Sequence, residues 1–279
     1  YKLINECLEA LEYLEYRGYD SVGLAYKTKN NNINLVKTKG KVKELKLNIN
    51  DSDIESNMIM GHTRWATHGE PSNNNSHPHI SMNNIFCLVH NGIIENYDYF
   101  KKILVEAGYK FKGETDSEIL VNYIEFCYIS LKKEMDEKNE KLTSKILNDV
   151  IKYSIKKVIG TYGIVLYKID TPNKLFVLRN GSPISLGIMK DKIYISSCQY
   201  SFIKYTNKVV DLYDGQIAIL DNDKYLIEDI YSDEIIIPKI NKVKISNINV
   251  SKSGYKHYML KEIMEQTQSL NSCMKGRIN

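Results

Sequence analysis

Cysteine is scarce in this chain of 279 residues and follows no spacing pattern. No Cys-x-x-Cys pair occurs, and the count of five is odd. Irregular, distant cysteines argue against a disulfide framework and against a cysteine zinc site. We therefore expect a reducing, cytoplasmic compartment for this protein, whose cysteines are Cys7, Cys87, Cys127, Cys198 and Cys273.

Long apolar runs and a strong charge of either sign are also absent. No apolar stretch approaches the length that spans a bilayer, and nothing at the start resembles a signal peptide. Lys and Arg number 38 against 34 Asp and Glu, which gives a formal net charge of +4. Because this excess is small for the length, we expect neither nucleic acid nor a membrane as a partner.

What is present is a series of helix and strand patterns without internal repeats. Apolar residues recur at helical spacing from Leu3 to Leu14 and predict an amphipathic helix that ends at Arg17-Gly18. Strands flanked by separate helix pairs favour an α+β layered fold. By the same criteria we expect strands at 22–26, 33–36, 58–60 and 85–89, helices at 94–107, 117–131 and 146–158, an exposed charged insertion at 132–145, a meander of strands at 162–167, 174–178, 192–196 and 216–220, a linker or edge segment at 241–253, and a last helix at 257–274.

The first chemical motif is the run Gly61-His62-Thr63-Arg64-Trp65-Ala66-Thr67-His68-Gly69-Glu70-Pro71. Arg64 offers a planar fork for an α-carboxylate, and the flanking glycines allow the backbone to bend around a small molecule. For an isolated arginine, a structural ion pair is the simpler interpretation. Trp65, the only tryptophan in the chain, is either a core residue or a flat lid over a substrate held by Arg64.

The second motif is His90-Asn91-Gly92-Ile93-Ile94-Glu95-Asn96, directly after an expected strand. Asn91 offers a side-chain amide and Gly92 an unhindered backbone N–H, which is the material of an oxyanion hole. An Asn-Gly pair is more often a hairpin turn. Since a helix pattern follows instead of a partner strand, we expect a strand–loop–helix junction, where N–H groups are free to bind an anion.

The third motif is Glu114-Thr115-Asp116. Asp116 offers a counter-charge for an α-ammonium group. Asp116 may be read equally as a simple helix cap, because the composition from Thr115 to Glu118 is that of a helix start. One carboxylate can do both. Together with Arg64 and Asn91-Gly92, Asp116 supplies what is needed to hold a zwitterionic amino acid and to stabilise an oxyanion beside it.

Five of the six histidines fall between His62 and His90 and raise the question of a metal site. Their spacing matches no compact zinc pattern, and carboxylates are sparse nearby, so we expect no metal. His77-Pro78-His79 is better interpreted as a rigid loop wall, since proline restricts both itself and the residue before it.

None of the five cysteines is a convincing nucleophile. Cys7 lies on the apolar stripe of the first helix, Cys87 inside an apolar strand and Cys127 on a helix face, as packing residues do. Cys198, after Ser196-Ser197 at a strand end, looks the least buried, but no neighbour suggests activation. Cys273 belongs to the last helix.

The ordered set of motifs resembles the glutaminase domain, a class II glutamine amidotransferase domain, of the glutamine–fructose-6-phosphate aminotransferases. The resemblance covers nearly the whole chain, and the order of the pieces makes it specific. Besides the three motifs above, it rests on Leu14-Glu15-Tyr16-Arg17-Gly18-Tyr19-Asp20-Ser21, Gly160-Thr161-Tyr162-Gly163, Arg179-Asn180-Gly181-Ser182-Pro183 and His257-Tyr258-Met259-Leu260-Lys261-Glu262-Ile263-Met264-Glu265-Gln266.

This resemblance implies an N-terminal-nucleophile hydrolase fold, a four-layer αββα sandwich with two antiparallel sheets between helix layers. It implies a nucleophilic cysteine at the mature N-terminus, with its own α-amino group as base, and no cofactor. The thiol attacks the carboxamide of L-glutamine, and the ammonia converts fructose 6-phosphate to glucosamine 6-phosphate in amino-sugar (UDP-GlcNAc) biosynthesis. The chain begins at Tyr1 without that cysteine, and we expect truncation of a longer protein.

The site residues that the resemblance implies fall into three groups. The oxyanion hole is Asn91 with Gly92, Arg17 supports the site, and the substrate-binding residues are Arg64, Trp65, Thr67, His68, His77 and Asp116. Residues 1–240 would form the glutaminase domain without its extreme N-terminus. Residues 241–279 would lead to a C-terminal sugar-isomerase module of the same polypeptide, in a protein expected to be a homo-oligomer. The competing interpretation is a catalytically inactive module on the same fold that binds glutamine or a partner.

Overall fold

The computed structural model describes residues 2–28, 32–49, 54–67, 69–140, 143–171, 174–221, 224–243 and 254–274. The chain divides into two compact units, residues 1–242 and 243–279. The second contains the helix α6 (Tyr258–Met274), at the position that the sequence predicts. No helix among the described residues is long and apolar enough to cross a membrane.

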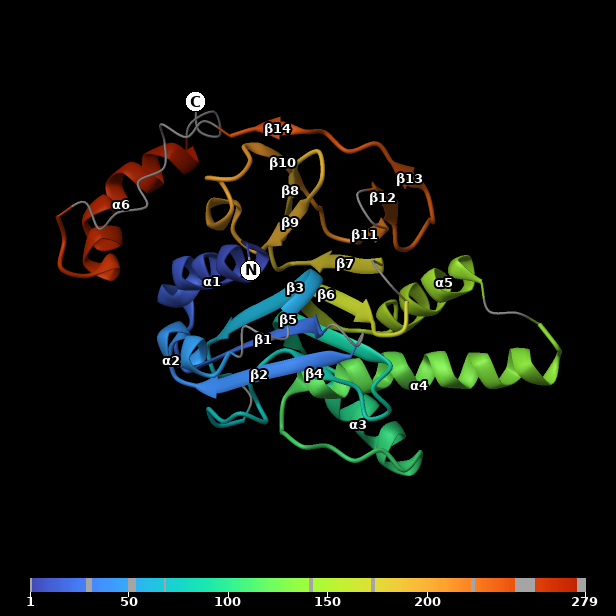
Figure 1. The fold of residues 1–279 in the computed structure, drawn as a ribbon. Helices are drawn as coiled ribbons and strands as arrows, with labels where there is room; N and C mark the ends of the chain where they lie inside the picture. The colour runs from blue at the N-terminus through green and yellow to red at the C-terminus, as the bar shows by residue number, and fades with distance from the viewer. Residues whose placement is uncertain are drawn as a thin grey trace. The chain divides into compact units, whose positions relative to one another are not determined.

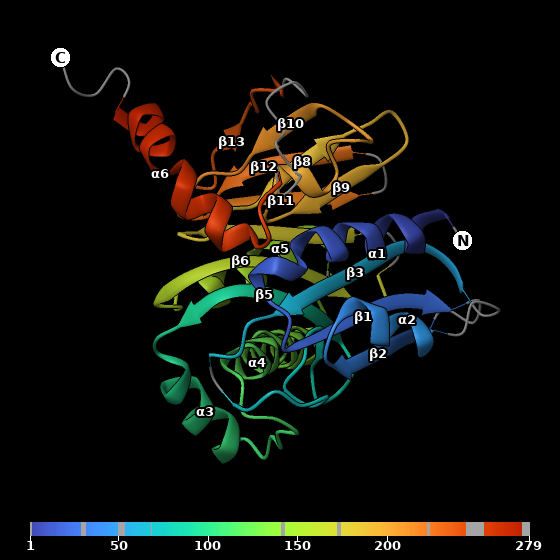
Figure 2. The ribbon, with the colours of Figure 1, turned by 90° about the vertical axis from the view of Figure 1, so that its left-hand side faces the viewer.

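The first unit opens with a helix and a small antiparallel sheet. The helix α1 (Lys2–Leu14) continues as one 3-10 turn, Glu15–Arg17. The sheet contains β1 (Ser21–Thr28), β2 (Ile33–Lys39) and β3 (Ile54–Arg64) in the order β2-β1-β3. Figure 2 shows α1 lying along β3. The three predicted strands are confirmed, although β3 extends from the expected apolar run into the first chemical motif.

A short helix, α2 (Val42–Leu47), was not predicted from the sequence. Its six residues are too few to show a helical period. Two carboxylates fix its start instead: Glu44 accepts the backbone N–H of Lys41 at 2.8 Å, and Glu15 accepts that of Val42 at 2.9 Å. A local capping bond and one tertiary contact therefore define the start of this helix together.

Seven strands form the large antiparallel sheet, in the order β13-β12-β11-β7-β6-β5-β4. Its centre is β5 (Phe86–Ile94), β6 (Gly160–Lys168), β7 (Lys174–Asn180) and β11 (Gln216–Asp221). The flanking strands are β4 (His79–Ile80), β12 (Lys224–Asp229) and β13 (Ile235–Ile236). A third sheet has the order β14-β10-β8-β9, with β8 (Ser185–Ile188), β9 (Ile193–Ser196), β10 (Lys208–Asp211) and β14 (Asn241–Lys242).

Three helices pack on one face of the large sheet and appear in green in Figure 1: α3 (Tyr97–Glu106), α4 (Asp116–Glu137) and α5 (Ser144–Ile155). Two predictions were wrong here. Residues 94–96 precede α3, because β5 continues to Ile94. The predicted insertion begins too early, because residues 132–137 continue α4; they are exposed as predicted except for Met135, which is 5% exposed.

Alternation along the strands accounts for the layers. In β5, Phe86 and Leu88 face the helices, whereas Cys87 and Val89 face the two smaller sheets. In the small first sheet, Val22, Leu24 and Tyr26 pack instead against α1 and α2. Three apolar clusters thus separate four layers, helices–sheets–sheet–helices, which confirms the α+β αββα prediction.

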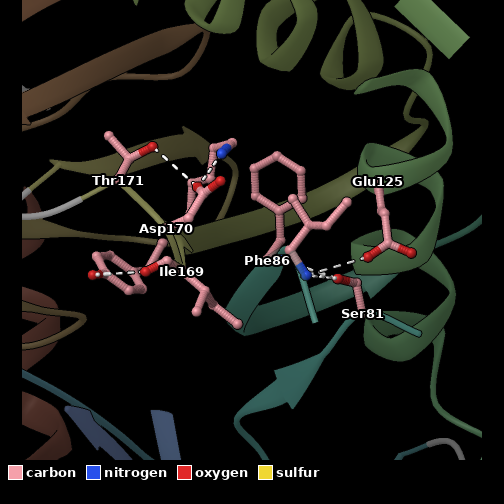
Figure 3. Close-up of polar contacts among 9 residues, drawn as sticks. Ser81, Phe86, Glu125, Ile169, Asp170 and Thr171 are labelled. Carbon is pink, nitrogen blue, oxygen red and sulfur yellow. Dashed lines mark hydrogen bonds and ion pairs between the residues drawn. The ribbon is translucent and has the colours of Figure 1, made fainter. Parts of the chain in front are cut away.

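One face of α4 is polar and holds the turn between β4 and β5 (Figure 3). Glu125, fully buried, accepts the backbone N–H of Ile85 at 3.4 Å, while Ser81 Oγ accepts those of Ile85 and Phe86 at 3.2 and 2.9 Å. One turn earlier along α4, Asn122 Oδ1 accepts the N–H of Met82 at 2.8 Å. These bonds fix the start of β5 against the helix that begins at Asp116.

Candidate active site

A cavity of about 440 Å³ opens between β3, β5, β6, β9 and the first turn of α4. Eight of the nine site residues predicted from the sequence line it; the ninth, His68, lies outside the described residues. The fold therefore gathers motifs that are up to about a hundred positions apart in the chain. The eight are Arg17, Arg64, Trp65, Thr67, His77, Asn91, Gly92 and Asp116.

Arg64 ends β3 and is 4% exposed. Its Nη2 donates to the carbonyl of Gly69 at 3.0 Å, and its Nη1 donates to that of Glu70 at 3.4 Å. Burial lowers the pKa of the guanidinium, while the charges of Asp20 and Asp116 act in the opposite direction. Arg64 thus holds the following segment through the carbonyls of Gly69 and Glu70, and it places a positive charge in the cavity wall.

The segment Gly18 to Asp20 packs along the backbone that follows β3. The N–H of Asp20 donates to the carbonyl of Arg64 at 3.2 Å, and Asp20 Oδ2 accepts the N–H of Ala66 at 2.6 Å. A Cβ added at Gly18 would stand 2.7 Å from the carbonyl carbon of Arg64. Only glycine fits this close approach, which explains why Arg17-Gly18-Tyr19-Asp20 accompanies the first motif.

Trp65 is not a core residue, because 60% of its surface is exposed. Its ring meets that of Tyr19 edge to face, with centroids 5.9 Å apart. Trp65 itself lines the cavity, so the core interpretation is wrong and the lid stays a prediction. Nearby, Arg17 Nε donates to Tyr16 Oη at 2.8 Å.

Asn91 and Gly92 lie within β5, where they pair with Gly163 and Tyr162 of β6. The expected strand–loop–helix junction at this pair was therefore wrong: a partner strand exists, supplied by a segment about seventy positions later. Gly92 has φ +139°, in the region that favours glycine. The pair is neither a hairpin turn nor a helix entrance but an irregular point in a strand at the cavity.

Asp116 is the first residue of α4 and is 5% exposed. Its Oδ2 accepts the N–H of Ile94 at 2.8 Å, and its Oδ1 accepts the N–H of Ser117 at 2.8 Å. The N-cap is Thr115, whose hydroxyl accepts the N–H of Glu118 at 3.1 Å. The simple capping interpretation of Asp116 is therefore wrong; its carboxylate ties α4 to the end of β5.

Asn75, which the sequence analysis missed, joins the first and third motifs. Its amide donates to the carbonyl of Glu70 at 2.9 Å, and its Oδ1 accepts the N–H of Glu114 at 2.8 Å. Asn75 is 4% exposed. Since Arg64 also donates to Glu70, this buried amide couples the arginine loop to the helix start that carries Asp116. No local pattern marks Asn75, which lies in a polar Asn-rich stretch.

Four imidazoles cluster beside the cavity. The rings of His62 and His77 stack with centroids 4.2 Å apart, and His77 meets His79 edge to face at 4.7 Å. The backbone N–H of His90 donates to His77 Nδ1 at 3.4 Å. Burial lowers the pKa of His62 to about 3 and those of His77, His79 and His90 below the usual value. The cluster is therefore uncharged near neutral pH.

Two of the histidines also contact side chains at the start of α4, in or directly after the third motif. His79 Nε2 lies 3.1 Å from Thr115 Oγ1, and His90 Nδ1 lies 2.8 Å from Ser117 Oγ. His90 Nε2 lies 3.3 Å from the carbonyl of Thr161. His90, Ser117 and Thr161 all line the cavity and were not predicted as site residues. Among the described residues, no three His, Cys, Asp or Glu side chains are placed to hold a metal ion.

Three of the four cysteines whose side chains are described are poor nucleophiles, because burial disfavours their thiolates. Burial raises the pKa of Cys7 and of Cys87 to about 12, and it raises the pKa of Cys127. Cys198, expected to be the least buried, is 8% exposed, less than Cys7 and Cys127. The side chain of Cys273 lies outside the described part of the chain.

The sequence and the fold were compared with those of known proteins. Residues 22–134 match the family model described as a glutamine amidotransferase domain. Glutamine–fructose-6-phosphate aminotransferase (isomerizing) from Bacteroides thetaiotaomicron is 40% identical over 273 residues, and the enzyme of the same name from Francisella tularensis is 39% identical over 269 residues. These matches cover 98% and 96% of the chain but only 42% and 41% of the two relatives.

Among solved structures, glutamine phosphoribosylpyrophosphate amidotransferase from B. subtilis superposes with a TM-score of 0.65. The match is 23% identical and covers 83% of this chain and 47% of that one. At this identity the likeness concerns the fold, which is that of the N-terminal-nucleophile hydrolases. With the sequence matches and the gathered motifs, it leads to one assignment: the chain contains a glutamine amidotransferase domain, matched over residues 22–134.

Proposed function

We propose that the chain is the glutaminase part of a glutamine–fructose-6-phosphate aminotransferase. It would release ammonia from L-glutamine for the conversion of fructose 6-phosphate to glucosamine 6-phosphate in UDP-GlcNAc biosynthesis. The observation that carries the proposal is the pair Arg64 and Asp116: a buried guanidinium and a buried carboxylate line one cavity. This pair is complementary to the α-carboxylate and the α-ammonium of an amino acid. Trp65, Thr67, His68 and His77 would complete the substrate-binding wall, and Arg17 would support it.

The nucleophile we propose is the thiol of a cysteine at the mature N-terminus, ahead of Tyr1. Among the described residues, β3 pairs only with β1 and β9 only with β8, and both strands reach the cavity. Each has a backbone edge that can pair with a further strand carrying that cysteine. The raised pKa values of Cys7, Cys87 and Cys127 support an external nucleophile over an internal one.

In this mechanism the N-terminal amino group takes the thiol proton, and the resulting thiolate sulfur attacks the carboxamide carbon of glutamine. The carbonyl oxygen gains negative charge, which the Asn91 amide and the Gly92 N–H would stabilise. The proton passes to the departing nitrogen as ammonia leaves and a thioester remains. Water then attacks the thioester carbon, which releases glutamate and restores the thiol.

The other parts of the proposal concern the longer protein. Since the relatives extend well beyond the matched region, residues 241–279 would lead into a C-terminal sugar-isomerase module that receives the ammonia. We propose that the longer protein is a homo-oligomer. We also propose a cytoplasmic location, which the four free cysteines support: Cys7, Cys87, Cys127 and Cys198. An inactive binding module on the same fold is the alternative, and glutamine turnover distinguishes the two.

The carboxylate clamp can be tested by calorimetry of glutamate binding to the 279-residue chain. Arg64→Ala should weaken binding by about 2–5 kcal/mol, because it leaves the ligand carboxylate in a buried site without a partner. Arg64→Lys keeps the charge but loses the fork, so it should recover part of the loss. If Arg64→Ala binds glutamate with unchanged affinity, Arg64 does not bind the ligand carboxylate.

A further inference from the structure

A continuous line of hydrogen-bonding polar atoms runs from the exposed Thr161 in β6 through the buried His90 in β5 to α4. The Thr161 carbonyl lies 3.3 Å from His90 Nε2, and His90 Nδ1 lies 2.8 Å from Ser117 Oγ. Ser117 Oγ in turn lies 3.3 Å from Asp116 Oδ1. His90, Ser117 and Asp116 are only 3%, 2% and 5% exposed, so the contacts between these three side chains are shielded from water.

The protons on this line can be placed by elimination. A carbonyl oxygen only accepts hydrogen bonds, so the Thr161 contact requires a proton on His90 Nε2. Burial lowers the pKa of His90, although the charge of Asp116 opposes the shift, and the neighbouring imidazoles His62 and His77 are also buried and uncharged. A neutral ring with its proton on Nε2 leaves Nδ1 as an acceptor.

Ser117 has a single hydroxyl proton and two possible acceptors, His90 Nδ1 at 2.8 Å and Asp116 Oδ1 at 3.3 Å. Since Nδ1 accepts and is the nearer, the proton belongs to the bond with His90. Among the described residues, Asp116 Oδ1 then accepts only the N–H of Ser117, and Oδ2 accepts that of Ile94. Each carboxylate oxygen keeps a lone pair for a further donor.

We propose that His90 and Ser117 are positioning residues that keep Asp116 open to the α-ammonium group of the substrate. The Thr161 carbonyl selects the tautomer of His90, and the tautomer draws the Ser117 hydroxyl away from the carboxylate. This inference rests on the proposed role of Asp116 in glutamine binding. It goes beyond that role by naming what governs the acceptor capacity of the carboxylate.

If His90 and Ser117 only support the fold, removing both side chains should affect substrate binding differently than the proposal predicts. If His90 only packs, removing Ser117 as well can only add to the damage. If His90 diverts the hydroxyl, His90→Phe should turn the Ser117 proton toward Asp116, where it competes with the ammonium. Ser117→Ala in the same protein then removes the competitor and should repair binding.

Steady-state glutaminase kinetics on the full-length protein can decide between these outcomes. We expect His90→Phe to raise the KM for glutamine about tenfold or more, with a much smaller change in kcat. The double variant His90→Phe/Ser117→Ala should recover to within about threefold of the parent KM, and His90→Asn, which can place an acceptor near the Nδ1 position, should recover similarly. A double variant with a KM as high as that of His90→Phe would overturn the proposal.

Direct observation of the tautomer gives an independent test. In the full-length protein labelled with ¹⁵N-histidine, long-range ¹H–¹⁵N correlation should show His90 neutral at pH 7 with its proton on Nε2; His90→Asn identifies the signal. A proton on Nδ1, or on both nitrogens, would overturn the inference. If the parent protein releases no glutamate from glutamine, the proposed function fails, whereas the tautomer measurement still judges the hydrogen-bonded line by itself.

Discussion

The backbone of Gly92 in β5 lies against the carbonyl of Thr161 in β6, and a Cβ added at residue 92 would stand 2.1 Å from that oxygen. The same Cβ would stand 3.0 Å from His90 Nε2. The Thr161 carbonyl is also the partner of His90. At this point β5 therefore contacts β6 through both the backbone of Gly92 and the side chain of His90. The close approach of β5 to the Thr161 carbonyl is possible only because residue 92 has no side chain.

We expect Gly92→Ala to be strongly destabilising, because the new methyl group must displace a backbone carbonyl. Gly108 is the matched control: it also has positive φ, at +85°, but a Cβ there would meet nothing within 4 Å. In urea unfolding of the chain, Gly92→Ala should lose about 1–3 kcal/mol more than Gly108→Ala. Equal losses would mean that the contact with Thr161 relaxes without cost.

Asn91 is expected to act on the transition state and not on substrate binding. In the full-length protein, Asn91→Ala should lower kcat for glutamine hydrolysis about 100- to 1,000-fold and leave KM nearly unchanged. Asn91→Asp keeps the size but removes the amide donor, so its kcat should fall at least as far. A variant that loses affinity and keeps its turnover would assign Asn91 to substrate binding instead.

The buried histidines should make the fold sensitive to acid. Burial lowers the pKa of His77 and His79 in the folded state, so the unfolded chain binds more protons below the ordinary histidine pKa of about 6.5. The free energy of unfolding should be level above that pH and fall below it, by up to about 1.4 kcal/mol per pH unit for each buried histidine. For His62 the decline should end near its folded pKa of about 3.

Urea unfolding between pH 7 and pH 4.5 checks this expectation. His79→Gln should reduce the slope with pH, because one buried group no longer titrates. His257→Gln, which changes an exposed histidine directly before α6, should leave the slope as it is. If the slope does not change in His79→Gln, His79 is not held neutral by the fold.

The chemistry of the site could be predicted from the sequence because it depends on residue type. A guanidinium, a carboxylate and an amide beside glycine are interpretable before any contact is known, and Arg64, Asp116 and Asn91 do line one cavity. Their supports could not be predicted. His90 and Ser117 are 27 positions apart and His90 and Thr161 are 71 apart, so their pairing depends on the assembled sheet and helix.

The errors in secondary structure have a similar cause. The helical pattern that begins near Ile94 is real, but pairing with β6 keeps β5 extended through that residue. The charged stretch from 132 to 137 is predicted as an exposed insertion, but it continues α4, and Met135 is buried. Cys198 looks accessible after two serines, but it is only 8% exposed, at the start of a turn, Gln199–Ser201, that lies close to α1. In each case a tertiary contact outweighs the local pattern.

Glutamine turnover tests the account most directly. Glutamate and ammonia released from L-glutamine should be measured for the full-length protein, for its N-terminal Cys→Ala variant and for the chain that begins at Tyr1, each with and without a thiol-alkylating reagent. The account predicts equimolar glutamate and ammonia from the parent alone, abolished by alkylation, because the remaining groups hold glutamine but cannot attack it. Alkylation-sensitive turnover by the chain that begins at Tyr1 would show an internal cysteine, with Cys198 the first to examine, to be the nucleophile and would contradict the account.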